Sequence, residues 1–166
     1  MTQPALVLIG PMGSGKSRIG KRIAKLLEAE FTDTDKVIVA EHGSIATIFE
    51  QHGEPYFRAV EREVVATALA GDGVVSLGGG AVLDEATQAD LERQRVVLFT
   101  VTPEAVAPRL ANEKRPLVKN GLDDWLRIRD ARMPLYERLA DATFDTSTRP
   151  TSIIAEEVAA WVRQNA

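Results

Sequence analysis

The sequence contains no cysteine, few aromatic residues and no long apolar run. The absence of cysteine excludes a disulfide framework, a thiolate metal site and a cysteine nucleophile. No stretch approaches the roughly 20 apolar residues that are needed to span a bilayer. Met1–Pro4 lead directly into an apolar run, without the charged and long apolar regions of a signal peptide. We therefore expect a cytoplasmic protein.

The chain also lacks an excess of positive charge. Its 20 basic and 24 acidic residues give a formal net charge of -4. This balance provides no basic field that would attract nucleic acid independently of its sequence. A local anion pocket remains compatible with it, because such a pocket needs only a few arginines. We expect small-molecule partners, no nucleic acid or membrane, and a monomer.

The length of 166 residues suits one domain, in which short apolar runs alternate with longer segments of helical periodicity. Continuous apolar runs are typical of strands that are buried on both faces of a parallel sheet. The alternation predicts an α/β fold with a parallel sheet and helices on both faces. The strand candidates are Ala5–Ile9, Phe31–Asp33, Val74–Leu77, Arg95–Val101 and Ala142–Asp145.

The segment Gly10–Ser17 (GPMGSGKS) fits the phosphate-loop pattern G-x-x-x-x-G-K-[ST]. A strand candidate precedes it and a helical pattern follows it. Glycines let the backbone turn its N–H groups inward, where they attract phosphate oxygens. Lys16 is predicted to bridge the β- and γ-phosphates, and Ser17 to bind Mg²⁺. The motif indicates a nucleoside triphosphate without choosing between a GTPase, an ATPase and a small-molecule kinase.

Two motifs of GTPases and ordinary ATPases are missing. The segment Asn112–Arg115 (NEKR) does not supply the guanine-reading pattern N/T-K-x-D. The strand candidate Val74–Leu77 ends in three glycines, residues 78–80, where an acidic residue usually binds magnesium. These glycines form either a tight turn or a place where a ligand approaches bare backbone, and we favour the second interpretation.

A pair of aspartates, Asp33 and Asp35, is the best replacement for the missing acidic residue. The pair follows the second strand candidate. Residues two apart in an extended segment point to the same side, so we expect both carboxylates to face one cleft. One would then serve a metal and the other an acceptor hydroxyl. The alternative is a helix-capping aspartate with a solvated neighbour.

Arginines on later segments indicate an anionic acceptor. Arg58 and Glu61 are three residues apart in the predicted helix Glu54–Ala70 and share one face, although such a pair alone is usually a surface ion pair. Arg129 and Arg132 form a second helical pair. Arginine binds carboxylate or phosphate with a two-pronged fork and stays charged. The pattern thus predicts an anionic acceptor, or clamping of the transferred phosphoryl group.

A polar segment, residues 112–124, separates two helical patterns. It contains Pro116 and Gly121 and has few apolar residues. Segments with little apolar burial have low local stability, so we predict a mobile loop. Arg115 lies in this segment.

Six segments, in this order and spacing, resemble shikimate kinase across nearly the whole chain. No single one is decisive beyond the phosphate loop, but the set is highly specific. The segments are Gly10–Ser17, Asp33–Asp35, Phe57–Glu61, Leu77–Val82, Arg115–Leu117 and Arg132–Tyr136.

The resemblance implies a three-layer α/β/α fold of the P-loop, nucleoside monophosphate kinase-like type, with a five-stranded parallel sheet. It implies a single kinase domain, residues 1–166, with the lid at about 112–124 and a substrate-binding segment at about 33–62. The implied reaction transfers the γ-phosphoryl group of ATP to the 3-hydroxyl of shikimate. Its products are shikimate 3-phosphate and ADP, in aromatic amino acid biosynthesis.

The resemblance also implies roles on the acceptor side. Asp35 binds the acceptor hydroxyls and can act as base, while Arg58 and Arg132 hold the carboxylate of shikimate. Further acceptor contacts are implied for Glu61, Gly79 and Gly80.

On the nucleotide side, the resemblance implies that Asp33 joins Ser17 around Mg²⁺ and that Arg115 reaches the phosphates from the lid. Lys16 and Arg115 then count with Asp35 as catalytic. One departure is Arg18, because many relatives have threonine directly after the loop serine. The implied nucleotide-binding residues are Gly13, Ser14, Gly15, Lys16, Ser17, Arg18, Arg115 and Arg149.

Two rival functions were weighed. Another small P-loop kinase, for gluconate or a nucleotide, is the nearest rival. A nucleotide acceptor calls for aromatic stacking, but only 5% of the residues are aromatic. A non-catalytic nucleotide-binding module is the second rival, and the intact Lys16, Ser17, Asp33 and Asp35 argue against it.

Overall fold

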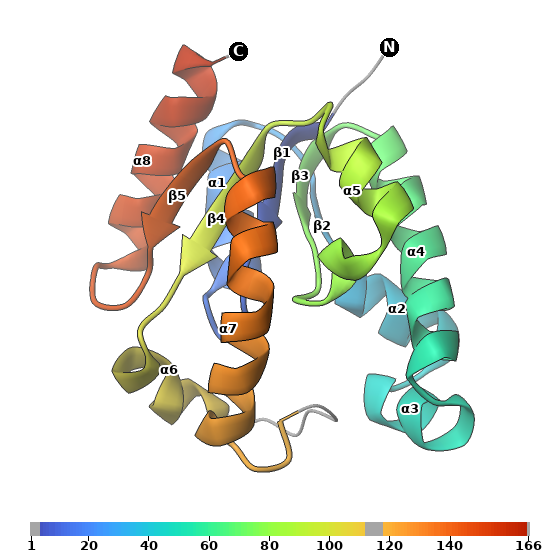
Figure 1. Cartoon of the computed structure of the whole chain (residues 1–166). Coiled ribbons are helices and arrows are strands. Elements are labelled where there is room, and N and C mark those ends of the chain that lie inside the picture. Colours follow the sequence, from blue (N-terminus) through green and yellow to red (C-terminus); the bar gives the residue numbers. More distant parts are fainter. Residues whose placement is uncertain (1–3, 112–117, 166) are drawn as a thin grey trace.

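The computed structural model describes residues 4–111 and 118–165. Five parallel strands form one sheet in the order β2-β3-β1-β4-β5, as Figure 1 shows. This confirms the predicted five-stranded parallel sheet. The strands are β1 (Pro4–Ile9), β2 (Phe31–Asp33), β3 (Gly73–Ser76), β4 (Val96–Thr100) and β5 (Ala142–Asp145).

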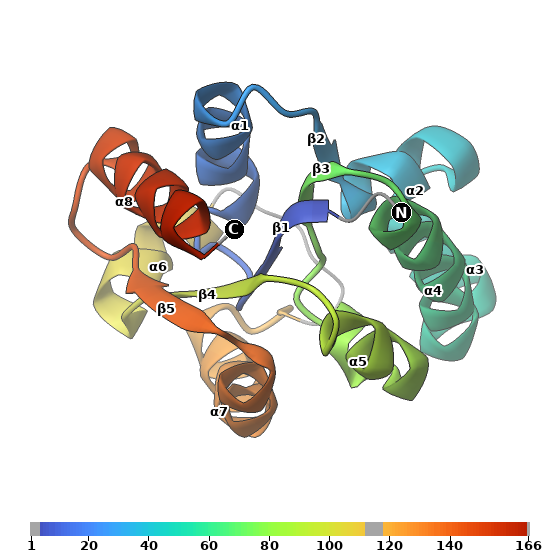
Figure 2. The same cartoon turned by 90° about the horizontal axis from the view of Figure 1, so that it is seen from above.

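Helices cover both faces of the sheet. Seen from above, α1 and α8 lie on one side, and α5 and α7 lie on the other (Figure 2). No helix among the described residues is both long and apolar enough to cross a membrane. The helices are α1 (Lys16–Leu26), α2 (Thr34–His42), α3 (Ile45–His52), α4 (Glu54–Ala70), α5 (Glu85–Leu91), α6 (Pro103–Leu110), α7 (Leu122–Leu139) and α8 (Thr151–Gln164), with a 3-10 turn at Ala81–Leu83.

The central strand β1 shows why the sequence folds as three layers. Leu6 and Leu8 belong to the core that includes α1 and α8, whereas Val7 and Ile9 belong to the core that includes α4, α5 and α7. All four side chains are fully or almost fully buried. Side chains alternate between the faces of a strand, so a continuous apolar run fills two cores at once.

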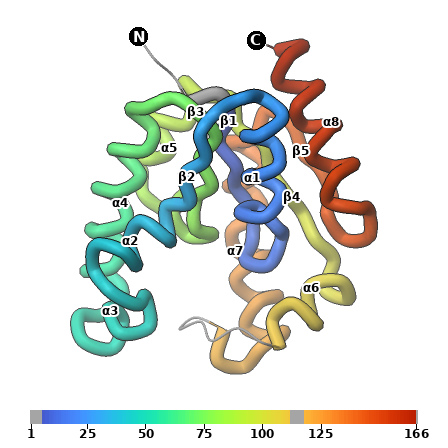
Figure 3. The backbone as a smooth tube through the Cα atoms, turned by 180° about the vertical axis from the view of Figure 1, so that it is seen from behind, coloured from blue at the N-terminus to red at the C-terminus, as the bar shows by residue number. Residues whose placement is uncertain are grey.

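The register of the strands brings their carboxyl ends to one edge of the sheet. Ser76 pairs with Leu8 on one side and with Asp33 on the other. The loops after β1, β2 and β3 therefore emerge side by side. Figure 3 shows α3 and α6 at this end of the molecule, and both termini at the opposite end. Ligands of open parallel sheets bind outside the carboxyl ends of the strands.

The last residues of the predicted lid, residues 122–124, form the first turn of α7. Gly121 donates its N–H to the carbonyl of Val118 in a turn, and α7 begins at Leu122. The Asp124 carboxylate accepts the Asn120 N–H at 2.9 Å, which fastens this turn to the first turn of the helix. The acidic start of α7 explains the boundary, because carboxylates near a helix N-terminus are favourable. The rest of the predicted lid, residues 112–117 with Arg115, lies outside the described residues.

Candidate active site

The phosphate loop adopts a backbone that requires glycine. Gly10, Gly13 and Gly15 have φ angles of 143°, 78° and 90°. A Cβ atom on Gly10 would lie 2.3 Å from the carbonyl oxygen of Phe99, so a larger residue would push the loop off the sheet. Gly15 is the N-cap of α1, and this helix points its N-terminus into the loop. Backbone N–H groups at such a terminus attract phosphate.

Lys16 lies where the sequence placed it, in the first turn of α1, and its side chain is largely buried. The Nζ atom donates hydrogen bonds to the carbonyls of Gly10 and Pro11, at 2.8 and 3.0 Å. The ammonium group thus lies against the first two carbonyls of the phosphate loop. A charge held there is in place to meet the phosphates of a nucleotide.

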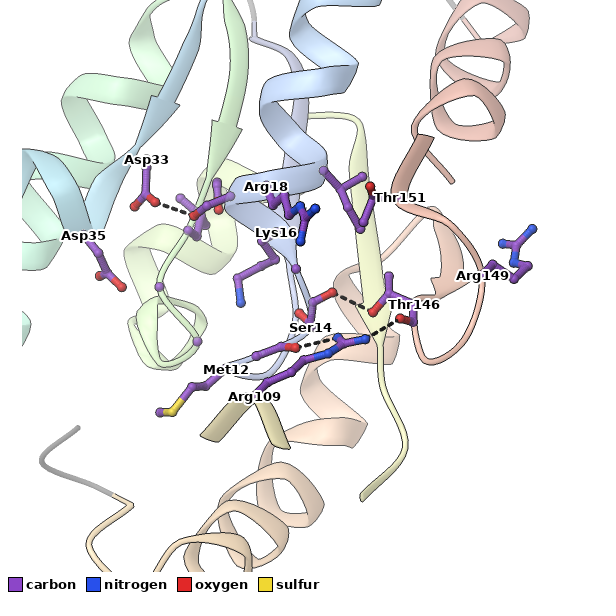
Figure 4. A pocket seen from close by; sticks show the side chains of 18 residues that line it. Met12, Ser14, Lys16, Arg18, Asp33, Asp35, Arg109, Thr146, Arg149 and Thr151 are labelled. Carbon is purple, nitrogen blue, oxygen red and sulfur yellow. Dashed lines mark hydrogen bonds between the residues drawn. The ribbon is translucent and has the colours of Figure 1, made fainter. Parts of the chain in front are cut away.

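Ser17 and Asp33 fit the predicted magnesium site. The hydroxyl of Ser17 donates a short hydrogen bond to Oδ2 of Asp33, as the dashed line in Figure 4 shows. Hydroxyl and carboxylate oxygens are the hard ligands that Mg²⁺ prefers, and one or two protein ligands suffice when phosphates supply others. In the described part of the chain, no three His, Cys, Asp or Glu side chains gather into a metal cluster. The oxygens of Ser17 and Asp33 suit a metal whose other ligands come from a nucleotide.

The local structure around the two aspartates differs from the prediction. Asp33 ends β2 and caps α2, because its Oδ1 accepts the Lys36 N–H at 3.3 Å. Asp35 lies in the first turn of α2, so the argument from an extended segment is wrong. Both residues nevertheless line the same cavity, whose volume is about 380 Å³. Asp33 is at once a helix cap and a candidate metal ligand.

The far wall of this cavity comes from segments late in the chain. Arg109, on α6, donates to the carbonyls of Gly13 and Thr146 at 2.8 and 2.9 Å (Figure 4). Arg18 and Arg149, both predicted to bind nucleotide, also line the cavity. The guanidinium of Arg149 forms a close ion pair with Glu157. Arg109 was not among the predicted site residues, and its only local signal is a basic residue in the last turn of a helix.

A second, smaller cavity adjoins the first. It collects the predicted acceptor residues Arg58, Glu61 and Arg132 from α4 and α7. Asp35 lines both cavities, and so do Met12, Gly78 and Gly79. Asp35 therefore stands where a nucleotide in the larger cavity would meet a ligand in the smaller one.

Arg58 is held by carboxylates of its own helix. Its Nε and Nη2 donate to Oε2 of Glu54 at 3.3 and 3.2 Å, and its Nη1 donates to Oε1 of Glu61 at 2.7 Å. A guanidinium has five N–H donors. These bonds use three of them, and among the described residues the other two have no protein acceptor. Two donors suffice for a two-pronged contact with one carboxylate.

Glu61 is a buried carboxyl group, with 3% of its surface exposed. Burial raises its pKa, an effect that the nearby Arg58 opposes. A Cβ atom on Gly78 would lie 2.6 Å from Oδ1 of Asp35 and 3.0 Å from Oε2 of Glu61. The first of the three glycines therefore leaves room for two carboxylates of the protein itself.

Helix α7 closes the smaller cavity from the other side with Arg132. One turn later, the hydroxyl of Tyr136 donates a 2.5 Å hydrogen bond to the carbonyl of Gly79. Burial raises the pKa of Tyr136, so this hydroxyl keeps the proton that it donates. Arg129 does not join the cavity, because its guanidinium lies over the ring of Trp125, 5.1 Å from the ring centre.

Two aromatic side chains, Phe49 and Phe57, line the smaller cavity with Ile45. Their ring centres are 5.0 Å apart and the rings are tilted by 42°. Tyr56 does not line this cavity, and its ring stacks on that of His52. The lining of the cavity therefore combines apolar side chains with charged ones.

Comparisons with known proteins decide the family. A family model described as shikimate kinase matches residues 12–163. A shikimate kinase of Streptomyces avermitilis is 44% identical over 162 residues, which cover 95% of each chain. The solved structure of a shikimate kinase from Acinetobacter baumannii, in complex with shikimate, matches with a TM-score of 0.91 and 32% identity, over 99% of this chain and 95% of that chain. The chain belongs to the shikimate kinase family.

Membership of the shikimate kinase family confirms the predicted activity, that of an ATP-dependent phosphotransferase of the shikimate pathway. The solved structure of a gluconokinase from Sinorhizobium meliloti covers 99% of this chain and 94% of that chain, with a TM-score of 0.60 and 18% identity. That likeness shows the shared fold alone. The rival acceptor considered from the sequence therefore gains no support from it.

Proposed function

We propose that the chain transfers the γ-phosphoryl group of ATP in line to the 3-hydroxyl of shikimate, with Mg²⁺ held beside Ser17 and Asp33. The observation that carries the proposal is the place of Asp35, at the junction of the phosphate-loop cavity and the arginine-lined cavity. In-line transfer needs the donor phosphate and the acceptor hydroxyl to meet at one point.

The acceptor would be held by its carboxylate and its hydroxyls. The two remaining N–H donors of Arg58 and the guanidinium of Arg132 match a carboxylate. Nη1 of Arg58 donates to Oε1 of Glu61 at 2.7 Å, which holds the guanidinium in place. Gly79 and Gly80 line the same cavity. This leaves Asp35 to bind the reacting hydroxyl and to accept its proton.

The donor side would be held by the N–H groups of the phosphate loop and by Lys16. These groups stabilise the charge that spreads over the transferred phosphoryl group. Bound Mg²⁺ would supply further positive charge beside the phosphates. We also propose that Arg115 and the lid at residues 112–124 contribute to this side, although residues 112–117 lie outside the described part of the chain.

We propose further that the protein is a cytoplasmic monomer. Within the described ranges, the large apolar side chains that are exposed lie on five different elements instead of forming one patch, and they are Leu26, Val39, Tyr56, Leu83 and Ile153. Scattered apolar residues of this kind do not make an interface.

A coupled assay of ADP release tests the proposed function. Turnover should require ATP, Mg²⁺ and shikimate together, and should fall to background when gluconate or a nucleoside monophosphate replaces shikimate. Nuclear magnetic resonance of the product should place the phosphate on the 3-hydroxyl. ADP release at the same rate without any acceptor would indicate a simple ATPase and would refute the proposal. A faster reaction with gluconate than with shikimate would show that the chain is the rival kind of kinase.

A further inference from the structure

Helix α7 reaches both catalytic loops with side-chain hydrogen-bond donors. Nε1 of Trp125 donates to the carbonyl of Met12, in the phosphate loop, at 2.8 Å. The hydroxyl of Tyr136 donates to the carbonyl of Gly79, in the glycine turn after β3, at 2.5 Å. Arg132 lies between them in sequence, and spacings of seven and four residues put all three on one face of a helix.

The bond from Trp125 is one of a set that holds the carbonyls of the phosphate loop. Every carbonyl from residue 10 to residue 14 accepts a side-chain donor. Lys16 binds the first two, Trp125 the third and Arg109 the fourth, while Thr146 binds that of Ser14 at 2.6 Å. The loop is therefore held through its carbonyl oxygens.

Fixing a carbonyl also fixes an N–H group. In a trans peptide, the C=O of one residue and the N–H of the next lie in one plane and point in opposite directions. The bond from Trp125 to Met12 thus orients the N–H of Gly13. The bond from Tyr136 to Gly79 likewise orients the N–H of Gly80. Within the described residues neither of these N–H groups has a protein acceptor, and Gly13 and Gly80 line the larger and smaller cavities respectively.

Both donors are themselves fixed by packing. Trp125 is 2% exposed and packs with Val106, Leu110 and Val118, while Arg129 covers its ring. Tyr136 is 1% exposed and lies in the core that also contains Ile9. Neither ring can turn without disrupting a packed cluster, so the two donor atoms are held in place.

We propose that Trp125 and Tyr136 are positioning residues of the phosphoryl transfer. Trp125 aims the N–H of Gly13 at the nucleotide phosphates, and Tyr136 aims the N–H of Gly80 at the acceptor. Because one continuous helix carries both donors, α7 links the positions of the two reactants. The assignment of a reactant to each cavity rests on the proposed function.

The test removes each donor and keeps its ring. Tyr136→Phe deletes only a hydroxyl. For Trp125, benzothienylalanine, which replaces the indole N–H by sulfur, is incorporated in place of tryptophan in a Trp161→Phe background. This background leaves one tryptophan, since the chain has two. The matched controls are Trp161→Phe alone and Tyr56→Phe, which alters a tyrosine that is 45% exposed.

We expect the two changes to separate in the kinetics. The Trp125 replacement should raise the KM for ATP about tenfold and change the KM for shikimate less than about twofold. Tyr136→Phe should do the reverse, and the controls should leave both constants unchanged. Tenfold corresponds to about 1.4 kcal/mol, within the cost of leaving one hydrogen-bonding group unsatisfied.

A loss of thermal stability with both KM values unchanged would show a structural role only and would overturn the proposal. Equal rises of both KM values in both variants would overturn the division between the loops. Binding of ADP to the Trp125 variant, measured by calorimetry without shikimate, keeps this test separate from the proposed function. If the parent protein failed to use shikimate but the replacement still weakened ADP binding, the proposed function would fall and the role of Trp125 would stand.

Discussion

Gly80→Ala perturbs the candidate acceptor site through one methyl group. Gly80 has a φ angle of -97°, which alanine adopts without strain. The added Cβ would lie 2.4 Å from Nη2, 2.5 Å from Nη1 and 2.6 Å from Cζ of Arg58. Carbon and nitrogen atoms cannot approach so closely, so the guanidinium has to move. The backbone N–H of residue 80 is kept.

The displaced Arg58 would lose its alignment with the substrate carboxylate. Hydrogen bonds to charged groups contribute about 1.5–3 kcal/mol each, and about 1.4 kcal/mol changes a binding constant tenfold. Arg132 would still contact the carboxylate, so we expect a loss equivalent to about one such bond. The KM for shikimate should then rise about 10- to 100-fold, with the KM for ATP nearly unchanged.

Steady-state kinetics of Gly80→Ala, Arg58→Ala and the double variant measure this effect. If alanine acts only through Arg58, it should add less than about twofold in the Arg58→Ala background, because the obstructing side chain is gone. Fully additive losses in the double variant would mean that the methyl group blocks the substrate directly. An unchanged KM for shikimate in the single variant would refute the assignment of Arg58.

Three further predictions follow from single side chains. Asp35→Asn should lower turnover about 10²- to 10⁴-fold in the coupled assay and leave ATP binding nearly intact. A variant that keeps more than about a tenth of the parent turnover would show that Asp35 is not the base. Lys16→Ala should weaken nucleotide binding in calorimetry and almost abolish transfer, whereas normal turnover would contradict the phosphate-loop assignment. Burial raises the pKa of Glu61, so its contribution to stability is complete below the ordinary glutamate pKa and is lost as the pH rises through the raised value. Urea unfolding should therefore show the parent losing stability relative to Glu61→Gln as the pH rises from about 4 toward neutrality, and a pH-independent difference would contradict the shift.

The sheet was predictable because its information is local. Continuous apolar runs identify strands that are buried on both faces, and Leu6–Ile9 fill two cores as the run implied. The polar segment at residues 112–124 was predicted to be a loop, but α7 begins within it, at Leu122 and two aspartates. Their polarity is the usual composition of a first helical turn as much as of a loop. Composition alone could not separate the two.

The aspartate pair was found for a partly wrong reason. Alternation along a strand was expected to bring Asp33 and Asp35 to one cleft, but α2 starts between them. Asp33 confirms the helix-cap alternative and stays a candidate metal ligand, since one carboxylate oxygen accepts the Lys36 N–H and the other lies beside the Ser17 hydroxyl. A carboxylate has two oxygens, so the two interpretations never excluded each other.

The residues that hold Arg58 are close to it in the sequence, whereas most of the residues that bind the carbonyls of the phosphate loop are far from the loop. Glu54 and Glu61 are four and three residues from Arg58, a spacing that any helix brings together. The partners that hold the loop carbonyls are 96 residues away for Arg109, 113 for Trp125 and 132 for Thr146. No local pattern marks such residues, because only the finished fold brings them to the loop. The motif therefore predicts which N–H groups bind the phosphates, while the side chains that hydrogen-bond the loop carbonyls are visible only in three dimensions.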